Sequence, residues 1–124
     1  MTKEKQFFWF WGPALLYGAV IFAFSSYPLP FLPGFEIRYT DRFLHAVEYG
    51  ILGYLLARAF LGASRPFFQK SFQAWAVAVA VCYGFTDELH QLFVPMRQMN
   101  SWDLVFDGVG AFAAQFFFTG KKSG

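Results

Sequence analysis

Four apolar runs of nearly membrane-spanning length follow one another in this chain. They are Phe7–Tyr27, Phe43–Gly62, Phe72–Val94 and Trp102–Thr119. A transmembrane helix needs about 20 predominantly apolar residues. Only 15% of the 124 residues are charged, against roughly 25% in soluble globular domains. The sequence therefore predicts an all-α membrane protein: one domain over residues 1–124, a bundle of four transmembrane helices at about residues 7–27, 41–63, 71–94 and 101–119.

A soluble four-helix bundle and a cleaved signal peptide are the two alternatives to this fold. A soluble bundle would need a charged stripe on every helix, yet no charged residue lies between Lys5 and Glu36. Lys3 and Lys5 before an apolar run loosely resemble the start of a signal peptide, with residues 23–25 as the cleavage site. The run is longer than the usual signal-peptide core of about 7–15 residues, so we interpret it as the first transmembrane helix.

Basic residues flank the apolar runs on alternate sides and predict a topology. The positive-inside rule assigns loops rich in Lys and Arg to the cytoplasm. It therefore predicts that both termini are cytoplasmic and that the segment Tyr27–Thr40, which carries three prolines, is an ordered outer loop. The basic residues are scattered rather than gathered in one stripe, so we expect no nucleic-acid partner. The residues that set this topology are Lys3, Lys5, Arg58, Arg65, Lys70, Lys121 and Lys122.

Small residues at helical spacing indicate close helix packing. On the third and fourth helices, ionisable side chains continue the faces that carry these small residues, so the sequence predicts that the polar groups face the bundle and not lipid. On the second helix the small residues lie opposite the polar face, so protein is predicted on both sides of this helix. The single cysteine, Cys82, is predicted to be a packing residue. The stripes are Ala46, Gly50, Gly53 and Ala57; Ala76, Ala80 and Gly84; and Gly110 and Ala114.

A polar layer is predicted at the outer ends of three helices. Asp41, His45 and Glu48 share one face of the second helix. Thr40 or Asp41 is expected to cap that helix, and Ser101 the fourth. An ionisable group inside a membrane is expensive unless it is paired, and it commonly marks a functional site. The layer holds six of the eight carboxylates and both histidines: Asp41, Glu48, Asp87, Glu88, Asp103, Asp107, His45 and His90, with Arg42, Arg97 and Gln91.

The residues of this layer form motifs that resemble the VanZ-like membrane protein family. The motifs are Asp41-Arg42-Phe43-Leu44-His45 with Glu48-Tyr49-Gly50, the run Tyr83–Gln91, and Val94-Pro95 followed by Arg97, Ser101, Asp103, Asp107 and Gly110. The resemblance implies a small bacterial inner-membrane protein whose namesake accompanies glycopeptide resistance and favours protection against teicoplanin. Two positions depart from the usual pattern: Met96 replaces a common glycine, and Arg42 replaces a frequent lysine.

We expect this outward-facing site to bind or modify a cell-envelope lipid, a lipid-linked cell-wall precursor or a glycopeptide. Imidazole and carboxylate groups are suited to general acid–base chemistry, and arginines are suited to phosphate oxygens. The candidate catalytic residues are His90, Asp87, Glu88, His45 and Glu48. The candidate substrate-binding residues are Arg97, Arg42, Gln91, Asp41, Ser101, Asp103 and Asp107.

Three other interpretations of the polar layer stay open. His45, His90 and Asp87 are candidate ligands for a divalent metal ion, because imidazole and carboxylate suit zinc or manganese. Buried acids and histidines also occur in small proton- or ion-coupled transporters. In a non-catalytic structural or interaction protein, Asp41 and Asp103 would only stabilise helix N-termini.

Overall fold

The computed structural model describes residues 2–25, 37–63, 65–91, 93 and 101–118, and every regular element among them is helical. Four long helices match the four predicted ones. They are α1 (Lys3–Ser25), α2 (Ile37–Gly62), α4 (Phe72–Gln91) and α5 (Ser101–Ala114). A short helix, α3 (Pro66–Lys70), precedes α4, and a single 3-10 turn, η1 (Gln115–Phe117), follows α5.

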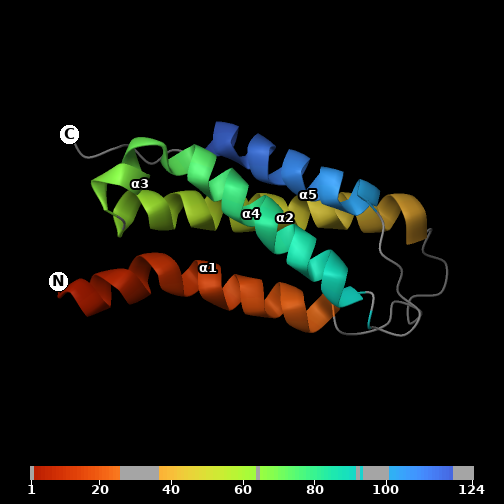
Figure 1. Ribbon diagram of the computed structural model, residues 1–124, viewed down its shortest axis with the longest axis horizontal. Coiled ribbons are helices and arrows are strands. Elements are labelled where there is room, and N and C mark those ends of the chain that lie inside the picture. Colours follow the sequence, from red (N-terminus) through yellow and green to blue (C-terminus); the bar gives the residue numbers. More distant parts are fainter. Residues whose placement is uncertain (1, 26–36, 64, 92, 94–100, 119–124) are drawn as a thin grey trace.

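The four long helices run alternately in opposite directions, with α2 packed against α1, α4 and α5 (Figure 1). We call one end of the bundle the aromatic end; it holds the start of α1, the end of α2, α3, the start of α4 and η1. The other is the polar end, with the end of α1, the start of α2, the end of α4 and the start of α5. The start of α1 and the 3-10 turn η1 thus both lie at the aromatic end.

Helix α2 begins earlier than the sequence indicates. Its first residue is Ile37, so Thr40 and Asp41 lie inside the helix and the predicted cap at this position is wrong. The predicted loop Tyr27–Thr40 is therefore helical in its last residues, and residues 26–36 lie outside the described residues. The short helix α3 was not predicted; Pro66 opens it, a position where the missing N–H of proline has no helical partner to lose.

Aromatic rings from four helices pack together at the aromatic end. The Phe60 ring lies 4.9 Å from the Trp11 ring and 5.7 Å from the Phe68 ring, measured between centroids. The Phe68 ring in turn lies 5.0 Å from the ring of Trp75. Such offset and edge-on pairs add about 0.5–1.5 kcal/mol each beyond simple burial. Helix α3 therefore contributes one partly buried ring, that of Phe68, which packs against the core.

An arginine joins α1 to α2 at the same end. Pro13 lies inside α1 and has no N–H to donate to the carbonyl of Trp9, four residues earlier. The guanidinium of Arg58 donates a hydrogen bond of 2.8 Å to this carbonyl and lies over the Trp9 and Phe10 rings. The carbonyl that the proline leaves without a helical partner is thus bonded to the neighbouring helix.

The predicted small-residue stripes are confirmed at the α2–α5 and α4–α5 contacts. A Cβ added at Gly110 would lie 2.0 Å from the backbone oxygen of Ala46, and one added at Gly53 would lie 2.9 Å from the Cα of Ala111. On α4, Ala76 and Ala80 are fully buried. These contacts bring helix backbones close enough for short side chains on different helices to meet.

Large apolar side chains cover much of the outside of the bundle. They come from every long helix and from η1; examples are Leu16, Phe22, Ile51, Phe85, Phe112 and Phe116. Of the described residues, one stretch, Lys3–Ala23 in α1, is both long and apolar enough to cross a membrane by length and composition. The predicted packing role of Cys82 is wrong, because its side chain is exposed on α4.

Candidate functional site

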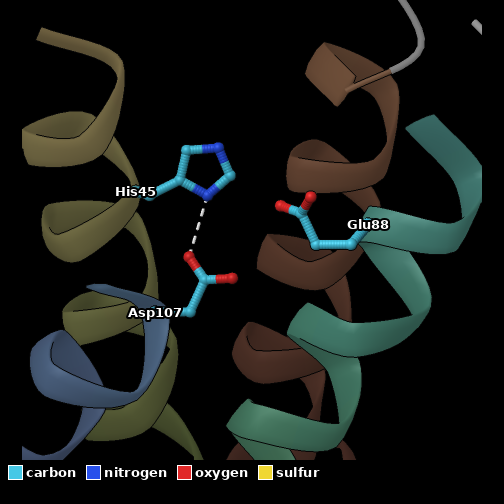
Figure 2. A group of neighbouring side chains, drawn as sticks. All are labelled: His45, Glu88 and Asp107. Atoms are coloured by element: carbon cyan, nitrogen blue, oxygen red, sulfur yellow. Dashed lines mark hydrogen bonds and ion pairs between the residues drawn. The ribbon is translucent and has the colours of Figure 1, made fainter. Parts of the chain in front are cut away.

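Three helices bring His45, Glu88 and Asp107 together near the polar end. His45 comes from α2, Glu88 from α4 and Asp107 from α5, and Figure 2 shows the Glu88 carboxylate directed toward the other two side chains. One nitrogen or oxygen atom from each residue lies within 4.8 Å of the others. His45 is 5% exposed, and Glu88 and Asp107 are 0% exposed. We call these three residues the buried triad.

His45 and Asp107 form the closest pair within the triad. The Nδ1 atom of His45 lies 2.8 Å from Oδ1 of Asp107. Ala46, the next residue on α2, packs against Gly110 of α5, so the small-residue contact sets the spacing that this hydrogen bond needs. An imidazole oriented by a carboxylate is the arrangement that general acid–base catalysis uses.

Gly84 makes room for Asp107 on the surface of α4. A Cβ added at Gly84 would lie 2.6 Å from Oδ2 of Asp107, too close for any real side chain. The sequence predicted Gly84 only as a packing residue. The structure shows that its missing side chain leaves the space which the Asp107 carboxylate occupies.

Tyr49 is a second residue whose place in the site the sequence did not predict. Its side chain is fully buried, and its hydroxyl donates a hydrogen bond of 3.3 Å to Oδ2 of Asp87. Its ring is nearly parallel to the His45 imidazole, with centroids 6.2 Å apart. The position four residues after His45, on the same helical face, is the signal that could have identified it.

Asp87 lies beside the triad without belonging to it. The residue is 4% exposed, and its second oxygen, Oδ1, is buried and receives no hydrogen bond from any residue that the structure describes. A buried carboxylate oxygen without a donor is costly in an apolar surrounding. The polar end therefore buries a third acid next to the two acids of the triad.

His90 and Glu48 lie outside the triad. The His90 ring stacks on Phe22 of α1, with centroids 4.3 Å apart, and is partly buried. Residues 88 and 90 of one helix are separated by about 200° of rotation, so Glu88 and His90 face different neighbours. Glu48 is partly exposed on α2. Their proposed catalytic roles stay predictions.

Most of the predicted substrate-binding side chains are not described. Asp41, Arg42, Gln91, Ser101 and Asp103 lie within helices, but the positions of their side chains are outside the described part of the structure, as is the whole of Arg97. Asp107 is the member of this group that the structure places, and it lies in the triad. The binding roles of the other six residues remain predictions.

The described basic side chains lie away from the triad. Lys3 and Lys5 begin α1, Arg65 and Lys70 flank or end α3, and Arg58 binds backbone carbonyls of α1. All of them belong to the aromatic end. The Lys and Arg side chains that the structure describes thus lie at the aromatic end, and those of Arg38 and Arg42, at the start of α2, are outside its described part.

The comparisons with known proteins agree with the sequence resemblance. No curated protein and no solved structure gives a significant match to the chain. A family model described as VanZ/LLP1 matches residues 5–120, which is nearly the whole chain. The chain therefore belongs to the VanZ/LLP1 family.

Proposed function

We propose that this protein spans the bacterial inner membrane with four helices and binds the polar head group of a cell-envelope lipid or lipid-linked precursor at its polar end. In this proposal both termini are cytoplasmic and the polar end faces outward. Binding of the lipid is the step that connects the protein to glycopeptide protection, against teicoplanin in particular.

The observation that carries the proposal is the convergence of His45, Glu88 and Asp107 from three helices inside an otherwise apolar bundle. Ionisable groups in a membrane bundle are costly to bury and usually mark a ligand or ion site. Membership in the VanZ/LLP1 family supports a membrane protein. A head group with hydroxyl or phosphate oxygens is a chemical partner for the imidazole and for the predicted outer arginines.

The exposed side chains of the bundle support its insertion in a membrane. Phe112, Phe116 and Leu16 are 59%, 77% and 69% exposed, and so many exposed large apolar side chains are unusual on a soluble monomer. Helices α2 and α4 are long enough to cross the hydrocarbon core, at 26 and 20 residues. The polar residues that form the site also lower the hydropathy of these two helices.

The hydrogen bond between His45 and Asp107 favours a second candidate function, modification of the bound lipid. An imidazole held by a carboxylate can accept a proton from water or from a substrate hydroxyl. Purified protein in lipid nanodiscs, incubated with undecaprenyl phosphate or a lipid-linked precursor, distinguishes the two functions. Release of product demonstrates an enzyme, whereas a retained, unchanged lipid detected by native mass spectrometry demonstrates binding alone.

The lipid proposal is tested by His45→Ala and Asp107→Asn in the same nanodiscs, with Glu4→Gln as a control at the opposite end of the bundle. We expect both site variants to lose the lipid that the wild type and the control retain. The same variants should lower teicoplanin protection in cells when expressed at equal levels. Full lipid binding and full protection in both folded site variants would contradict the proposal.

The topology is tested by labelling single cysteines from outside the cell. Cys82 is first replaced by serine, because it is exposed on α4. A cysteine at position 36 should then react with an impermeant label, and one at position 122 should react only after the membrane is opened. The reverse pattern would show that the termini lie outside.

A further inference from the structure

The buried triad has the composition and the spacing of a cation site. It offers one imidazole and two carboxylates from three different helices, with the candidate ligand atoms within 4.8 Å of one another. We propose that His45, Glu88 and Asp107 bind a divalent transition-metal ion, Zn²⁺ or Mn²⁺. This inference does not depend on the lipid proposal, and it changes the metal ligands expected from the sequence, which were His45, His90 and Asp87.

Charge is the first argument for a bound cation. Two ionised carboxylates and a neutral imidazole carry a net charge that one divalent ion would cancel. Burying carboxylates costs several kcal/mol each unless a partner of opposite charge compensates them. A divalent ion bound at the triad would compensate the two carboxylates, as bound cations often do in protein sites.

Geometry is the second argument. Zinc binds nitrogen and carboxylate oxygen at about 2.0–2.2 Å. The ligand atoms of a tetrahedral ion with these bond lengths lie about 3.3–3.6 Å apart. The Nδ1 of His45 and Oδ1 of Asp107 lie 2.8 Å apart, so the two atoms would separate by about 0.5 Å to bind an ion that replaces the proton between them. The whole set lies within 4.8 Å, and the Glu88 side chain would have to move toward the other two ligands to complete it.

Two residues next to the triad, Gly84 and Asp87, would support a bound ion without contacting it. Gly84 leaves the space for the Asp107 carboxylate, since a Cβ there would lie 2.6 Å from Oδ2. Asp87, more than nine-tenths buried, follows Gly84 by one helical turn and adds a carboxylate oxygen, Oδ1, that receives no hydrogen bond from the described residues. An additional buried acid increases the attraction of this region for a cation.

The donor set favours a transition metal over calcium or magnesium. Imidazole suits Zn²⁺ and Mn²⁺, whereas Ca²⁺ takes six to eight oxygen ligands and Mg²⁺ keeps several waters. Three protein ligands also leave a coordination position for water or for a ligand oxygen, as in catalytic zinc sites. The site would thus be open to a ligand oxygen.

The first experiment measures the metal directly. Full-length protein is purified in detergent without chelator, and its metal content is determined by inductively coupled plasma mass spectrometry. The chelated protein is then titrated with Zn²⁺ and with Mn²⁺ by calorimetry. We expect about one ion per chain, the number that a three-ligand site holds. No stoichiometric metal and no titratable binding of either ion would overturn the proposal.

The second experiment identifies the ligands. Loss of a ligand in Glu88→Gln or Asp107→Asn should weaken metal binding by more than roughly 10–100-fold. That smaller range is typical when a residue hydrogen-bonded to a ligand is replaced. Glu4→Gln is the matched control and should bind as the wild type. His90→Gln separates the two ligand sets: retained binding supports the buried triad, and binding lost together with that of Asp87→Asn would overturn it.

A third experiment, read out by absorption spectroscopy, tests the ligands in a different variant in case the substitutions above prevent folding. In a Cys82→Ser background, Asp107→Cys places a sulfur close to the position of the aspartate oxygen. With Co²⁺ in place of Zn²⁺, this variant should show a new sulfur-to-cobalt charge-transfer band that the background protein lacks. The absence of this band in folded, cobalt-treated protein would contradict ligation from position 107.

Discussion

The two ends of the bundle are held together in different ways. The aromatic end packs the rings of Trp11, Phe60, Phe68 and Trp75 from four helices. The polar end brings together three short, charged or polar side chains from α2, α4 and α5, at a place where glycines let the backbones approach. The energy of ring packing is spread over many small contacts, whereas the polar contacts depend on a few hydrogen-bond distances.

Helix α1 is bonded to the rest of the bundle mainly at the aromatic end. Gln6 donates a hydrogen bond of 2.9 Å to the carbonyl of Gly62, and Arg58 binds the Trp9 carbonyl. Toward the polar end, Tyr83 donates to the Gly18 carbonyl and Phe22 stacks on His90, but α1 supplies no member of the triad. We therefore predict that substitutions among the aromatic-end rings alter stability without altering the site.

The largest effect is expected for Gly110→Ala, which attacks the contact that supports the polar end. The new Cβ would lie 2.0 Å from the backbone oxygen of Ala46, so α2 and α5 must move apart. We expect a loss of about 3 kcal/mol, the upper end for overpacking, measured by denaturation in detergent micelles. Gly12→Ala is the control, because nothing lies within 4 Å of its added Cβ. Equal stability of the two variants would contradict this account.

Phe60→Ala is the corresponding test of the aromatic end. Its ring contacts those of Trp11, Phe68 and Trp75, so truncation leaves a cavity and should cost about 3 kcal/mol, the lower end for such truncations. The folded fraction should retain lipid and metal binding. Phe116→Ala, at a ring that is 77% exposed, should change stability little. Lost binding with unchanged stability would show that the two ends are not separable.

Glu88→Gln should give the opposite result to Phe60→Ala. The glutamine keeps the shape of the side chain but removes its charge, so the chelated, metal-free protein should lose little stability, because the cost of burying the charge is removed as well. Teicoplanin protection and metal binding should be lost. Both are measured on protein expressed at the wild-type level, as judged by immunoblotting of membranes. Retention of both activities would separate Glu88 from the site.

The smallest effect is expected for Tyr83→Phe, which removes the hydroxyl that donates to the Gly18 carbonyl. Hydrogen bonds between membrane helices contribute about 0.6 kcal/mol on average. A decrease of this size in a denaturation series would agree with a weak link between α1 and α4. A loss several times larger would show that α1 is needed to hold the polar end together.

The sequence predicted the four long helices because apolar runs of about 20 residues are difficult to place in any other structure. It did not predict α3, which is only five residues long and too short to show a helical period. The sequence indicates too late a start for α2, because polar residues such as those before Phe43 are typical of a loop and a helix cap. In the structure they form the first turns of the helix.

All three members of the triad were among the predicted site residues, yet the sequence did not single them out. Distance from the end of an apolar run gives the depth of a residue in the bundle. Which way the residue points also depends on how each helix is rotated against its neighbours, and this is decided by contacts such as Gly110 with Ala46 and Gly84 with Asp107. For this reason His90, at nearly the same depth as Glu88, instead stacks on Phe22 of α1.

The bond from Arg58 to the Trp9 carbonyl makes two distant positions evolutionarily dependent on each other. While Pro13 is present, the Trp9 carbonyl has no donor within its own helix, and losing the arginine would leave it unsatisfied. Once residue 13 regains an N–H, the arginine becomes dispensable. The order of substitutions should therefore matter: a lineage can give up the proline first and the arginine second, whereas the reverse path passes through a weakened protein.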